Sequence, residues 1–267
     1  MTARTLEILG ERALARADMP TLGAASAELP EGSYTTLRTY GGRGVARLER
    51  HLRRLEDSAG APPGTLDRGA VRRALGRVLD DAGHPESRLR ITFAPPRLFV
   101  TVEPFVALPA GLYAAGAWCV TLHLRRDNPR AKDTRFLASA DEARARLPPG
   151  AHEGVLVGGD GALLEGLSSN FFAVRGGRLY TEEERVLHGV TRDLVLEVAA
   201  SVLPRAGRAA RLEEAGAIEE AFLTSVSRGI LPVARLDDVV LGAAPGPVTS
   251  ALTEGFEERV RREVERL

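Results

Sequence analysis

The sequence predicts a mixed α/β (α+β) protein built from two domains. The chain has 267 residues, which is enough for one large domain or for two smaller domains with real cores. Segments with the two-residue period of strands and segments with the longer period of helices occur in both halves. A turn-rich stretch lies near residues 107–117, so we expect an N-terminal domain of residues 1–112 and a C-terminal domain of residues 113–267.

The N-terminal half shows short strands, a hairpin, two helices and two further strands. Aromatic and β-branched residues followed by Gly41-Gly42 indicate the hairpin. Leucines at helical spacing followed by Gly60 indicate the first helix and its end. In chain order the expected elements are short strands and turns in 1–31, the hairpin in 32–45, helices at 48–59 and 67–82, and strands at 88–93 and 97–103.

The C-terminal half begins with a strand and a helix and continues as an antiparallel β-meander. Glycine-rich turns separate the short apolar runs of this meander. In chain order the expected elements are a strand at 118–124, a helix at 135–147, the meander over 153–181, a helix at 194–202 with its start signals in 187–193, a short helix at 212–216, strands at 219–225 and 239–241, and a closing amphipathic helix over 247–267.

The composition excludes several classes of partner. Apolar residues make up 44% of the chain and charged residues 27%, which is ordinary for a soluble globular protein. The formal net charge is zero, so no basic field favours nucleic acid. No apolar run approaches the roughly 18 residues of a membrane span, and the N-terminus lacks the apolar core of a signal peptide. We therefore expect a cytoplasmic protein that binds neither nucleic acid nor membrane.

The cysteine and the histidines do not suggest a metal site or a disulfide. Cys119 is the only cysteine, and its apolar neighbours predict that it fills a core. The histidines show no pairing at metal-ligand spacing, so we expect no metal site. They are His51, His84, His123, His152 and His188.

The chain has kept a single lysine. Of its 36 Lys and Arg residues, only Lys132 is a lysine. Arginine can replace lysine in a surface salt bridge, but its guanidinium cannot form an imine with an aldehyde. A desolvated lysine, in contrast, can lose its proton and become a nucleophile. Lys132 is therefore either the residue that holds an aldehyde cofactor as a Schiff base or an ordinary surface lysine left by a bias toward arginine, and this feature alone favours neither.

Two other charged residues also have both a functional and a structural interpretation. Glu165 interrupts an apolar run just before Gly166, so it is either a charge in a turn or an inward-facing acid at a site. Arg54 lies beside the apolar stripe of the helix at 48–59. Spacing alone favours the interpretation of Arg54 as a solvated helix arginine.

Two segments suit a bound anion. The helix start at Gly189-Val190-Thr191 offers backbone N–H groups, although every helix has such an end. The loop Ser225-Val226-Ser227 offers small hydroxylated residues after a strand. One amine, one acid in apolar surroundings and two such loops are the parts of a pyridoxal 5'-phosphate site. The amine binds the aldehyde, the acid keeps the pyridine nitrogen protonated, and donors with an arginine hold the phosphate.

With these parts in this order, the sequence resembles the class IV aminotransferases, which are fold type IV pyridoxal phosphate enzymes. The family includes branched-chain and D-amino acid aminotransferases and aminodeoxychorismate lyases. The resemblance runs from about Gly32 to Val233. Its matching stretches are the hairpin at 34–42, the helix at 47–55 with its His-x-x-Arg-Leu, Lys132, the Glu-Gly-x-x-x-Asn stretch within 164–172, the Gly-Val-Thr-Arg-Asp at 189–193, and the segment before Pro232-Val233.

The resemblance implies a role for each matched residue. Lys132 would be the catalytic Schiff-base lysine, and Glu165 would face the pyridine nitrogen. The implied phosphate contacts are Arg54, Val190, Thr191, Ser225, Val226 and Ser227. Ser168 is a candidate for substrate contact. Arg90 either binds a substrate carboxylate or is a structural strand arginine.

The resemblance also implies a fold and an assembly. We expect a smaller N-terminal α/β domain and a larger C-terminal domain with a meander or barrel-like sheet and helices. The cofactor would lie in the cleft between them, and the protein would be a homodimer.

The implied activity is an aminotransferase that moves an amino group between an amino acid or amine and a 2-keto acid. The alternatives are an aminodeoxychorismate lyase, which eliminates pyruvate, and a non-catalytic binding protein on the same fold. Several residues depart from the family pattern. Thr35 stands where Glu is common, Arg135 and Phe136 replace Asn and Tyr, and Val226 replaces Thr. These departures leave the cofactor residues intact and leave the substrate open.

Overall fold

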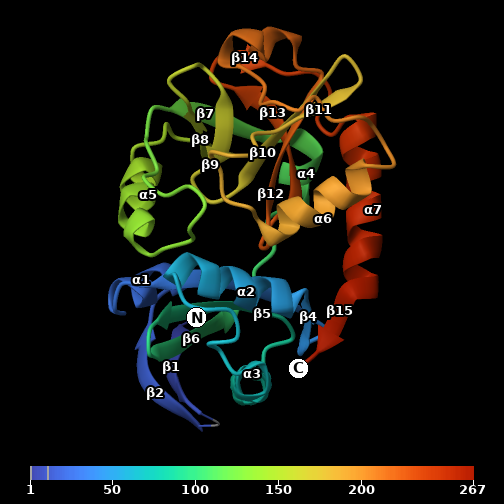
Figure 1. The fold of residues 1–267 in the computed structure, drawn as a ribbon. Coiled ribbons are helices and arrows are strands. Elements are labelled where there is room, and N and C mark those ends of the chain that lie inside the picture. Colours follow the sequence, from blue (N-terminus) through green and yellow to red (C-terminus); the bar gives the residue numbers. More distant parts are fainter. Residues whose placement is uncertain (1, 11) are drawn as a thin grey trace. The chain divides into compact units, whose positions relative to one another are not determined.

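The chain forms two compact units (Figure 1). The structure is a computed structural model that describes residues 2–10 and 12–267. The first unit runs to Val106 and also includes Ala131–Leu137 and Arg262–Leu267, while the second comprises Ala107–Arg130 and Ala138–Arg261. The segment that carries Lys132 therefore belongs to the first unit, although it follows the expected boundary at residues 112 and 113. The division into domains of residues 1–112 and 113–267 stays a prediction.

The first unit is built on a seven-stranded antiparallel sheet. Its strand order is β15-β4-β3-β5-β6-β1-β2. The elements of this unit are β1 (Ala3–Leu9), β2 (Arg12–Met19), α1 (Leu22–Ala27), β3 (Ser33–Tyr40), β4 (Gly44–Ala46), α2 (Leu48–Ala59), α3 (Arg68–Ala82), β5 (Ser87–Ala94), β6 (Arg97–Pro104) and β15 (Val264–Arg266).

Helices α2 and α3 share one hydrophobic core with this sheet. The apolar stripe of α2 buries Leu48, Leu52 and Leu55 completely, and α3 adds residues such as Leu75. Strand residues two apart share a face, and the sheet contributes Leu6, Ile8, Leu37, Leu89, Ile91, Phe93, Leu98, Val100 and Val102 to the same core. Gly60 ends α2 in the left-handed region, with φ at 66°, as the sequence predicts.

The second unit is built on an eight-stranded sheet. Its elements are α4 (Ala110–Ala115), β7 (Ala117–Leu122), α5 (Arg135–Ala145, with its first residues in the first unit), β8 (Glu153–Val157), β9 (Leu163–Gly166), β10 (Asn170–Arg175), β11 (Arg178–Tyr180), α6 (Val190–Ala199), the 3₁₀ helix η1 (Leu212–Ala217), β12 (Glu220–Ser225), β13 (Gly229–Leu236), β14 (Val239–Val240) and α7 (Pro247–Glu263).

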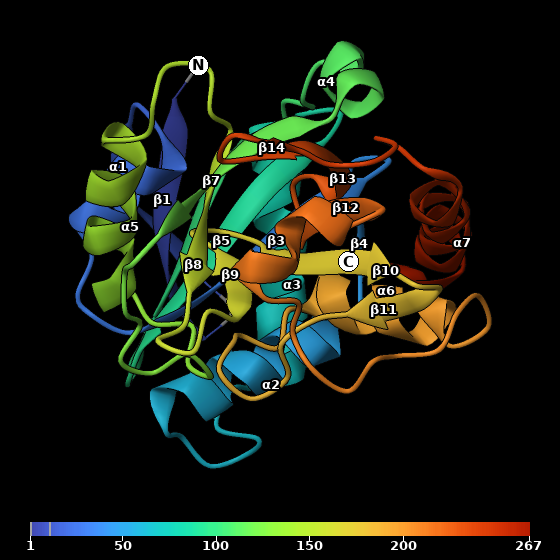
Figure 2. The ribbon, with the colours of Figure 1, turned by 90° about the horizontal axis from the view of Figure 1, so that it is seen from above.

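Six strands of this sheet close into a ring. The strand order is β11-β10-β12-β13-β7-β8-β9, and β9 pairs in addition with β10. That pairing joins the two ends of the path through Asn170 and Glu165, which are partners in the register. Figure 2 shows the six strands arranged around a common centre, with β11 and β14 outside the ring. The expected mixed α/β fold with a barrel-like sheet is confirmed.

The ring is packed with apolar side chains. Phe171, Leu223 and Val233 lie on neighbouring strands and are almost fully buried. Cys119 on β7 is also fully buried, as its apolar neighbours predict, and burial raises the pKa of its thiol. Cys119 is therefore a core residue.

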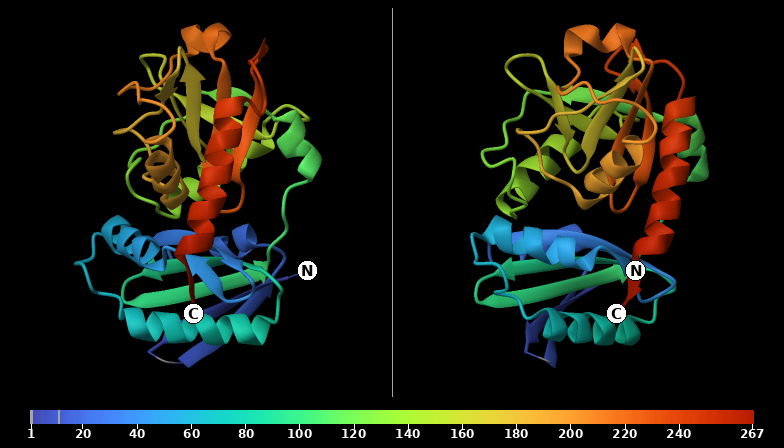
Figure 3. Two further views of the ribbon diagram at one scale, coloured as in Figure 1. Left: turned by 90° about the vertical axis from the view of Figure 1, so that its right-hand side faces the viewer. Right: turned by 45° about the vertical axis from the view of Figure 1, so that its right-hand side comes forward.

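Helix α7 is one long helix (Figure 3). It buries Leu252, Phe256 and Val260, which are spaced one turn apart. A Cβ at Gly255 would lie 2.6 Å from a methyl carbon of Val198, so α6 and α7 pack too closely there for a larger residue. No helix within the described part of the chain is long and apolar enough to cross a membrane.

Several elements differ from the sequence expectation. Strand β13 lies where no strand was expected, and α6 begins at Val190 instead of residue 194. Helices α1 and α4 have six residues each, which is too short for a helical period to show. The closing helix, expected to reach residue 267, ends at Glu263 because the next residues pair with β4 as strand β15. Backbone pairing to a distant strand thus overrides the local helical pattern.

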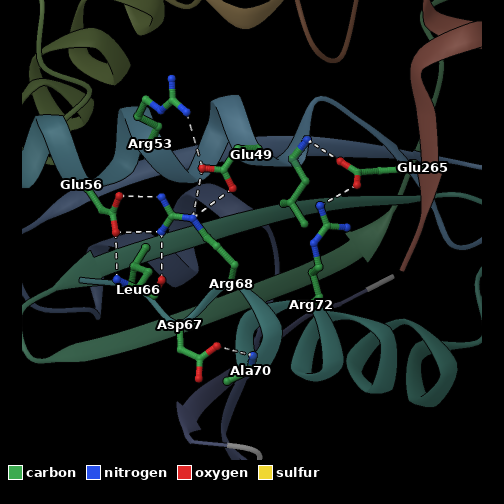
Figure 4. A network of polar contacts seen from close by, with 10 residues as sticks. Glu49, Arg53, Glu56, Leu66, Asp67, Arg68, Ala70, Arg72 and Glu265 are labelled. Atoms are coloured by element: carbon green, nitrogen blue, oxygen red, sulfur yellow. Dashed lines mark hydrogen bonds and ion pairs between the residues drawn. The ribbon is translucent and has the colours of Figure 1, made fainter. Parts of the chain in front are cut away.

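A buried carboxylate joins α2 to the segment that leads into α3 (Figure 4). Glu56 is completely buried and accepts two hydrogen bonds of 2.7 Å from the guanidinium of Arg68. The backbone N–H of Leu66 donates to the same carboxylate at 2.8 Å. Chiefly through the hydrogen bonds from Arg68, the pKa of Glu56 falls from 4.5 to about 2. Figure 4 also shows Glu49, which accepts from Arg68 on the other side.

We expect Glu56→Gln to lower the free energy of unfolding near neutral pH by about 2 kcal/mol. This value already allows for screening of the ion pair by solvent, because the Arg68 side chain is 25% exposed. A carboxyl with a depressed pKa stabilises the fold above its unfolded pKa, and this contribution is lost as pH falls from about 4.5 toward 2. Urea unfolding at pH 7 and pH 3 measures both effects. The wild type should lose more stability than the variant between these pH values, and equal losses would contradict the assignment.

Candidate functional site

In the first unit, the segment with Lys132 runs beside β3 and is held by its backbone. The N–H of Tyr34 donates to the carbonyl of Lys132 at 2.8 Å, and the N–H of Thr134 donates to the carbonyl of Gly32 at 2.8 Å. The N–H of Lys132 donates to Oγ of Ser58 at 3.0 Å. A Cβ at Gly32 would lie 2.4 Å from the carbonyl oxygen of Phe93, so only glycine fits where this segment meets the sheet. The backbone of Lys132 is thereby fixed.

The amine of Lys132 lies over an aromatic ring. Its Nζ is 4.6 Å from the ring centre of Tyr34, and the side chain is half-buried. The guanidinium carbon of Arg90 lies 4.8 Å from the same ring centre, and its Nη1 donates to Oγ of Ser26 at 2.6 Å. The structure thus brings the predicted lysine and the predicted carboxylate-binding arginine to one tyrosine.

Arg54 is buried, contrary to the interpretation that spacing alone favours. Its side chain leaves α2 toward β3, where its Nη2 donates to the hydroxyl of Thr35 at 2.8 Å. The Thr35 hydroxyl lies 2.7 Å from Nδ1 of His51. Burial, followed by the charges of Arg54, Lys132 and Arg50, lowers the pKa of His51 well below 6.5. His51 is therefore neutral, so that the Thr35 hydroxyl can donate to Nδ1 while it accepts from Arg54.

We expect Thr35→Val to lower the free energy of unfolding by about 2 kcal/mol, because Arg54 loses an acceptor and His51 a donor inside the protein. Thr35→Ser keeps the hydroxyl and is the matched control, with a loss below about 1 kcal/mol. Urea unfolding of the two variants at pH 7 measures the difference. Equal stability of the two variants would show that the hydroxyl does not hold this chain of hydrogen bonds together.

In the second unit, Glu165 lies at the point where the strand ring closes. The residue is 3% exposed. One carboxylate oxygen accepts from Nη1 of Arg126 at 3.0 Å, and the other accepts from the N–H of Leu187 at 3.0 Å and from the amide of Asn170 at 3.4 Å. A Cβ at Gly166 would lie 2.3 Å from Oγ of Ser169, so packing favours glycine at this position. Glu165 is thus an inward-facing acid held by donors.

The start of α6 places Val190 and Thr191 in buried positions. Gly189 precedes the helix without a side-chain cap, and a Cβ there would lie 2.4 Å from Oδ1 of Asn170. The next residue, Arg192, is also buried and donates from Nη2 to the carbonyl of Glu182 at 2.8 Å. Burial lowers the pKa of its guanidinium.

The second anion-suited segment is the turn between β12 and β13. Ser225, Val226 and Ser227 are all half-buried there, and the N–H of Arg228 closes the turn on the carbonyl of Ser225 at 3.2 Å. Ser168 does not stand alone as a substrate contact, because its hydroxyl donates to the carboxylate of Glu153 at 2.9 Å.

These residues suit pyridoxal phosphate by their chemistry. Two buried polar atoms near the candidate anion segments, Oγ1 of Thr224 and Nε of Arg192, have no hydrogen-bond partner among the residues described. One precedes Ser225 and the other follows Thr191, which is consistent with an additional polar group at both segments. A positioned amine, a buried acid, an arginine and hydroxyl-bearing loops form the donor set that such a cofactor needs.

Several site residues were missed by the sequence analysis. His51 lies one turn before Arg54 on α2, a spacing that was available as a signal. Asn170 was visible only as part of a motif. Arg126 comes from a loop 39 residues before Glu165, and Tyr34 depends on how β3 meets the Lys132 segment, so local pattern gave no signal for either.

Some known proteins are similar to part of this chain, and others are similar to nearly all of it. A Thermotoga maritima protein, provisionally named a branched-chain-amino-acid aminotransferase, is 38% identical over 107 residues, which is 39% of each chain. The aminodeoxychorismate lyase of Bacillus subtilis is 30% identical over 148 residues, which is 52% of this chain and 50% of the lyase. These alignments thus span two fifths to half of the relatives' lengths.

A solved structure and a family match extend over more of the chain. The crystal structure of a Thermotoga maritima protein, also provisionally called a branched-chain amino acid aminotransferase, has a TM-score of 0.81 and 28% identity, and covers 97% of this chain and 96% of that one. Residues 32–236 match the family described as amino-transferase class IV. The expected family is confirmed over the stretch in which the motifs lie, and this chain belongs to the class IV aminotransferases.

Proposed function

We propose that this chain is a pyridoxal-phosphate-dependent aminotransferase that moves an amino group between an amino acid or amine and a 2-keto acid. Class IV aminotransferases are pyridoxal phosphate enzymes. The observation that carries the proposal is the only lysine of the chain, whose backbone is held by hydrogen bonds and whose amine lies 4.6 Å from the centre of the Tyr34 ring.

We assign the cofactor contacts residue by residue. Lys132 would hold the aldehyde of the cofactor as a Schiff base, and Glu165 would pair with its pyridine nitrogen. Arg54, Val190, Thr191, Ser225, Val226 and Ser227 hold the phosphate. When bound, the cofactor supplies an electron sink for the charge that develops at the substrate's α-carbon.

The side chains of the protein move and hold the protons. With the cofactor bound, the Lys132 amine would take the proton from the substrate's α-carbon and give one back at the end of the transfer. The Glu165 carboxylate would keep a proton on the ring nitrogen, and Leu187, Asn170 and Arg126 hold it in place by hydrogen bonds. Arg90, at the same tyrosine ring as Lys132, binds the carboxylate of the amino or keto acid.

A homodimer in the cytoplasm is part of the proposal. The family resemblance supports the dimer, and the composition supports the compartment. Light scattering during size-exclusion chromatography should give twice the chain mass of 28.6 kDa, and a value equal to one chain would contradict the dimer.

An aminodeoxychorismate lyase is the second candidate. It is favoured by the similarity to the Bacillus subtilis lyase. The two activities differ in their need for an acceptor. Turnover of amino donors that depends on an added 2-keto acid supports the aminotransferase. Pyruvate release from aminodeoxychorismate without an acceptor supports the lyase.

The cofactor itself is tested by a spectrum and by trapping. Addition of pyridoxal phosphate to the purified chain should produce the absorbance of a protein-bound Schiff base. Reduction with borohydride and peptide mapping should then label Lys132 and, apart from the N-terminal amine, nothing else, because the chain has no other primary amine. Absence of the band would indicate a non-catalytic protein on this fold.

A further inference from the structure

A buried carboxylate in the second unit receives donors from two separate candidate segments. Glu153 begins β8 and is completely buried. Its Oε2 accepts from Nη1 of Arg228 at 2.5 Å, from Oγ of Ser168 at 2.9 Å and from Oγ of Ser169 at 3.2 Å. The resemblance assigns no role to Glu153 or Arg228, and neither is in the predicted site.

Arg228 connects this carboxylate to the candidate phosphate turn. Its backbone N–H donates to the carbonyl of Ser225 at 3.2 Å and so closes the turn. Its own carbonyl accepts from the hydroxyl of Tyr113 at 2.8 Å. Both the backbone and the side chain of Arg228 are thus held, and the ion pair with Glu153 opposes a shift of the turn.

The two serines connect the same carboxylate to the segment of the candidate acid. Ser168 and Ser169 lie between Glu165 and Asn170. Nη2 of Arg228 also reaches Oγ of Ser168 at 3.2 Å, which closes a triangle of contacts with Glu153. The packing there is tight, since a Cβ at Gly166 would lie 3.0 Å from Cγ of Glu153. The loop after Glu165 is therefore fixed against the turn 225–228.

We propose that Glu153 is a positioning residue that fixes the position of the candidate phosphate turn 225–227 relative to the loop that follows Glu165. This inference rests on the proposed function. Burial of a carboxylate costs free energy unless the carboxylate is paired. Conformations in which the donors stay in contact with Glu153 are therefore favoured. A displacement of the turn would move the hydroxyls and N–H groups meant for the phosphate, while the amine that binds the aldehyde belongs to another segment.

Another buried carboxylate of the same sheet provides a comparison. Glu220 on β12 is 4% exposed and accepts from the N–H groups of Val248 and Thr249 at 2.9 and 2.7 Å. These donors lie at the start of α7 and belong to neither candidate segment. Glu220→Gln is therefore a matched control for the loss of a buried charge.

The test compares two aldehydes that differ only in the phosphate. Absorbance titrations of the full-length chain with pyridoxal 5'-phosphate and with pyridoxal give two dissociation constants for each variant. We expect Glu153→Gln to raise the constant for pyridoxal phosphate about tenfold or more, and the constant for pyridoxal less than about threefold. Glu220→Gln should change the ratio of the two constants less than about twofold. An unchanged ratio in a folded Glu153→Gln protein would overturn the inference.

A second variant covers the case in which Glu153→Gln fails to fold. Arg228→Met removes the guanidinium but leaves Glu153 its two serine donors. It should also raise the constant for pyridoxal phosphate selectively, and an equal change for both aldehydes would contradict the positioning role. If the wild-type chain forms no Schiff base with either aldehyde, the proposed function fails. If the wild type binds but the ratio does not respond, only the role of Glu153 fails.

Discussion

Lys132→Arg should abolish amino transfer, with a loss of at least about 10³-fold in kcat. Arginine keeps a positive charge above the Tyr34 ring, and the backbone hydrogen bonds of residues 132 and 134 do not depend on the side chain. A guanidinium, however, neither forms an imine nor takes a proton from carbon. The measurement is keto-acid-dependent turnover, together with the absorbance of the Schiff base.

A second variant places the only amine elsewhere. Lys132→Arg combined with Arg135→Lys has the same number of lysines as the wild type, with the new amine at an exposed position on α5. We expect this protein to be as inactive as the single variant and to remain folded, as circular dichroism would show. Wild-type turnover in either variant would remove Lys132 from the mechanism.

Glu165→Gln should lower kcat by about 10²-fold or more and leave cofactor binding nearly intact. An amide cannot stabilise a proton on the pyridine nitrogen as a carboxylate does. The variant keeps an oxygen that can accept from the N–H of Leu187 but loses the ion pair with Arg126, so circular dichroism should accompany the kinetics to show that the protein is folded. The measurement is single-turnover kinetics with one amino donor, alongside a titration with pyridoxal phosphate.

Glu182→Gln is the control for this substitution. Glu182 is another buried acid of the second unit, and it accepts from the backbone N–H of Glu184 at 3.0 Å and from Arg185 at 2.7 Å. Its loss should lower stability while kcat changes less than about threefold. Equal losses of kcat in the two variants would indicate that Glu165 serves only the fold.

Helices and strands could be predicted from the sequence where the spacing of apolar residues stayed regular over several helical turns or along several strands. Helix α2 begins and ends where its leucines and Gly60 predict. Burial of Arg54 was not predictable from that pattern, because it depends on Thr35 of β3, which lies 19 residues earlier in the chain. The same holds for β15, which became a strand because an edge of the sheet was available to it.

The candidate site was predictable as a set of residue types and not as a set of contacts. A single lysine and an acid in an apolar run are visible in the sequence. The partners that hold them come from elsewhere, as Arg126 does for Glu165 and Ser58 for Lys132. The role of Glu153 was hidden for the same reason, since its place at the start of an apolar strand shows nothing of the donors it will meet.

The ring of six strands has its seam at Asn170 and Glu165, a single pair of register partners. The strand pair that closes the ring therefore also holds Glu165 in place. A substitution at Asn170 or Glu165 would therefore lower both the stability of the fold and the activity proposed for Glu165. Selection cannot change one of these properties at this position without changing the other.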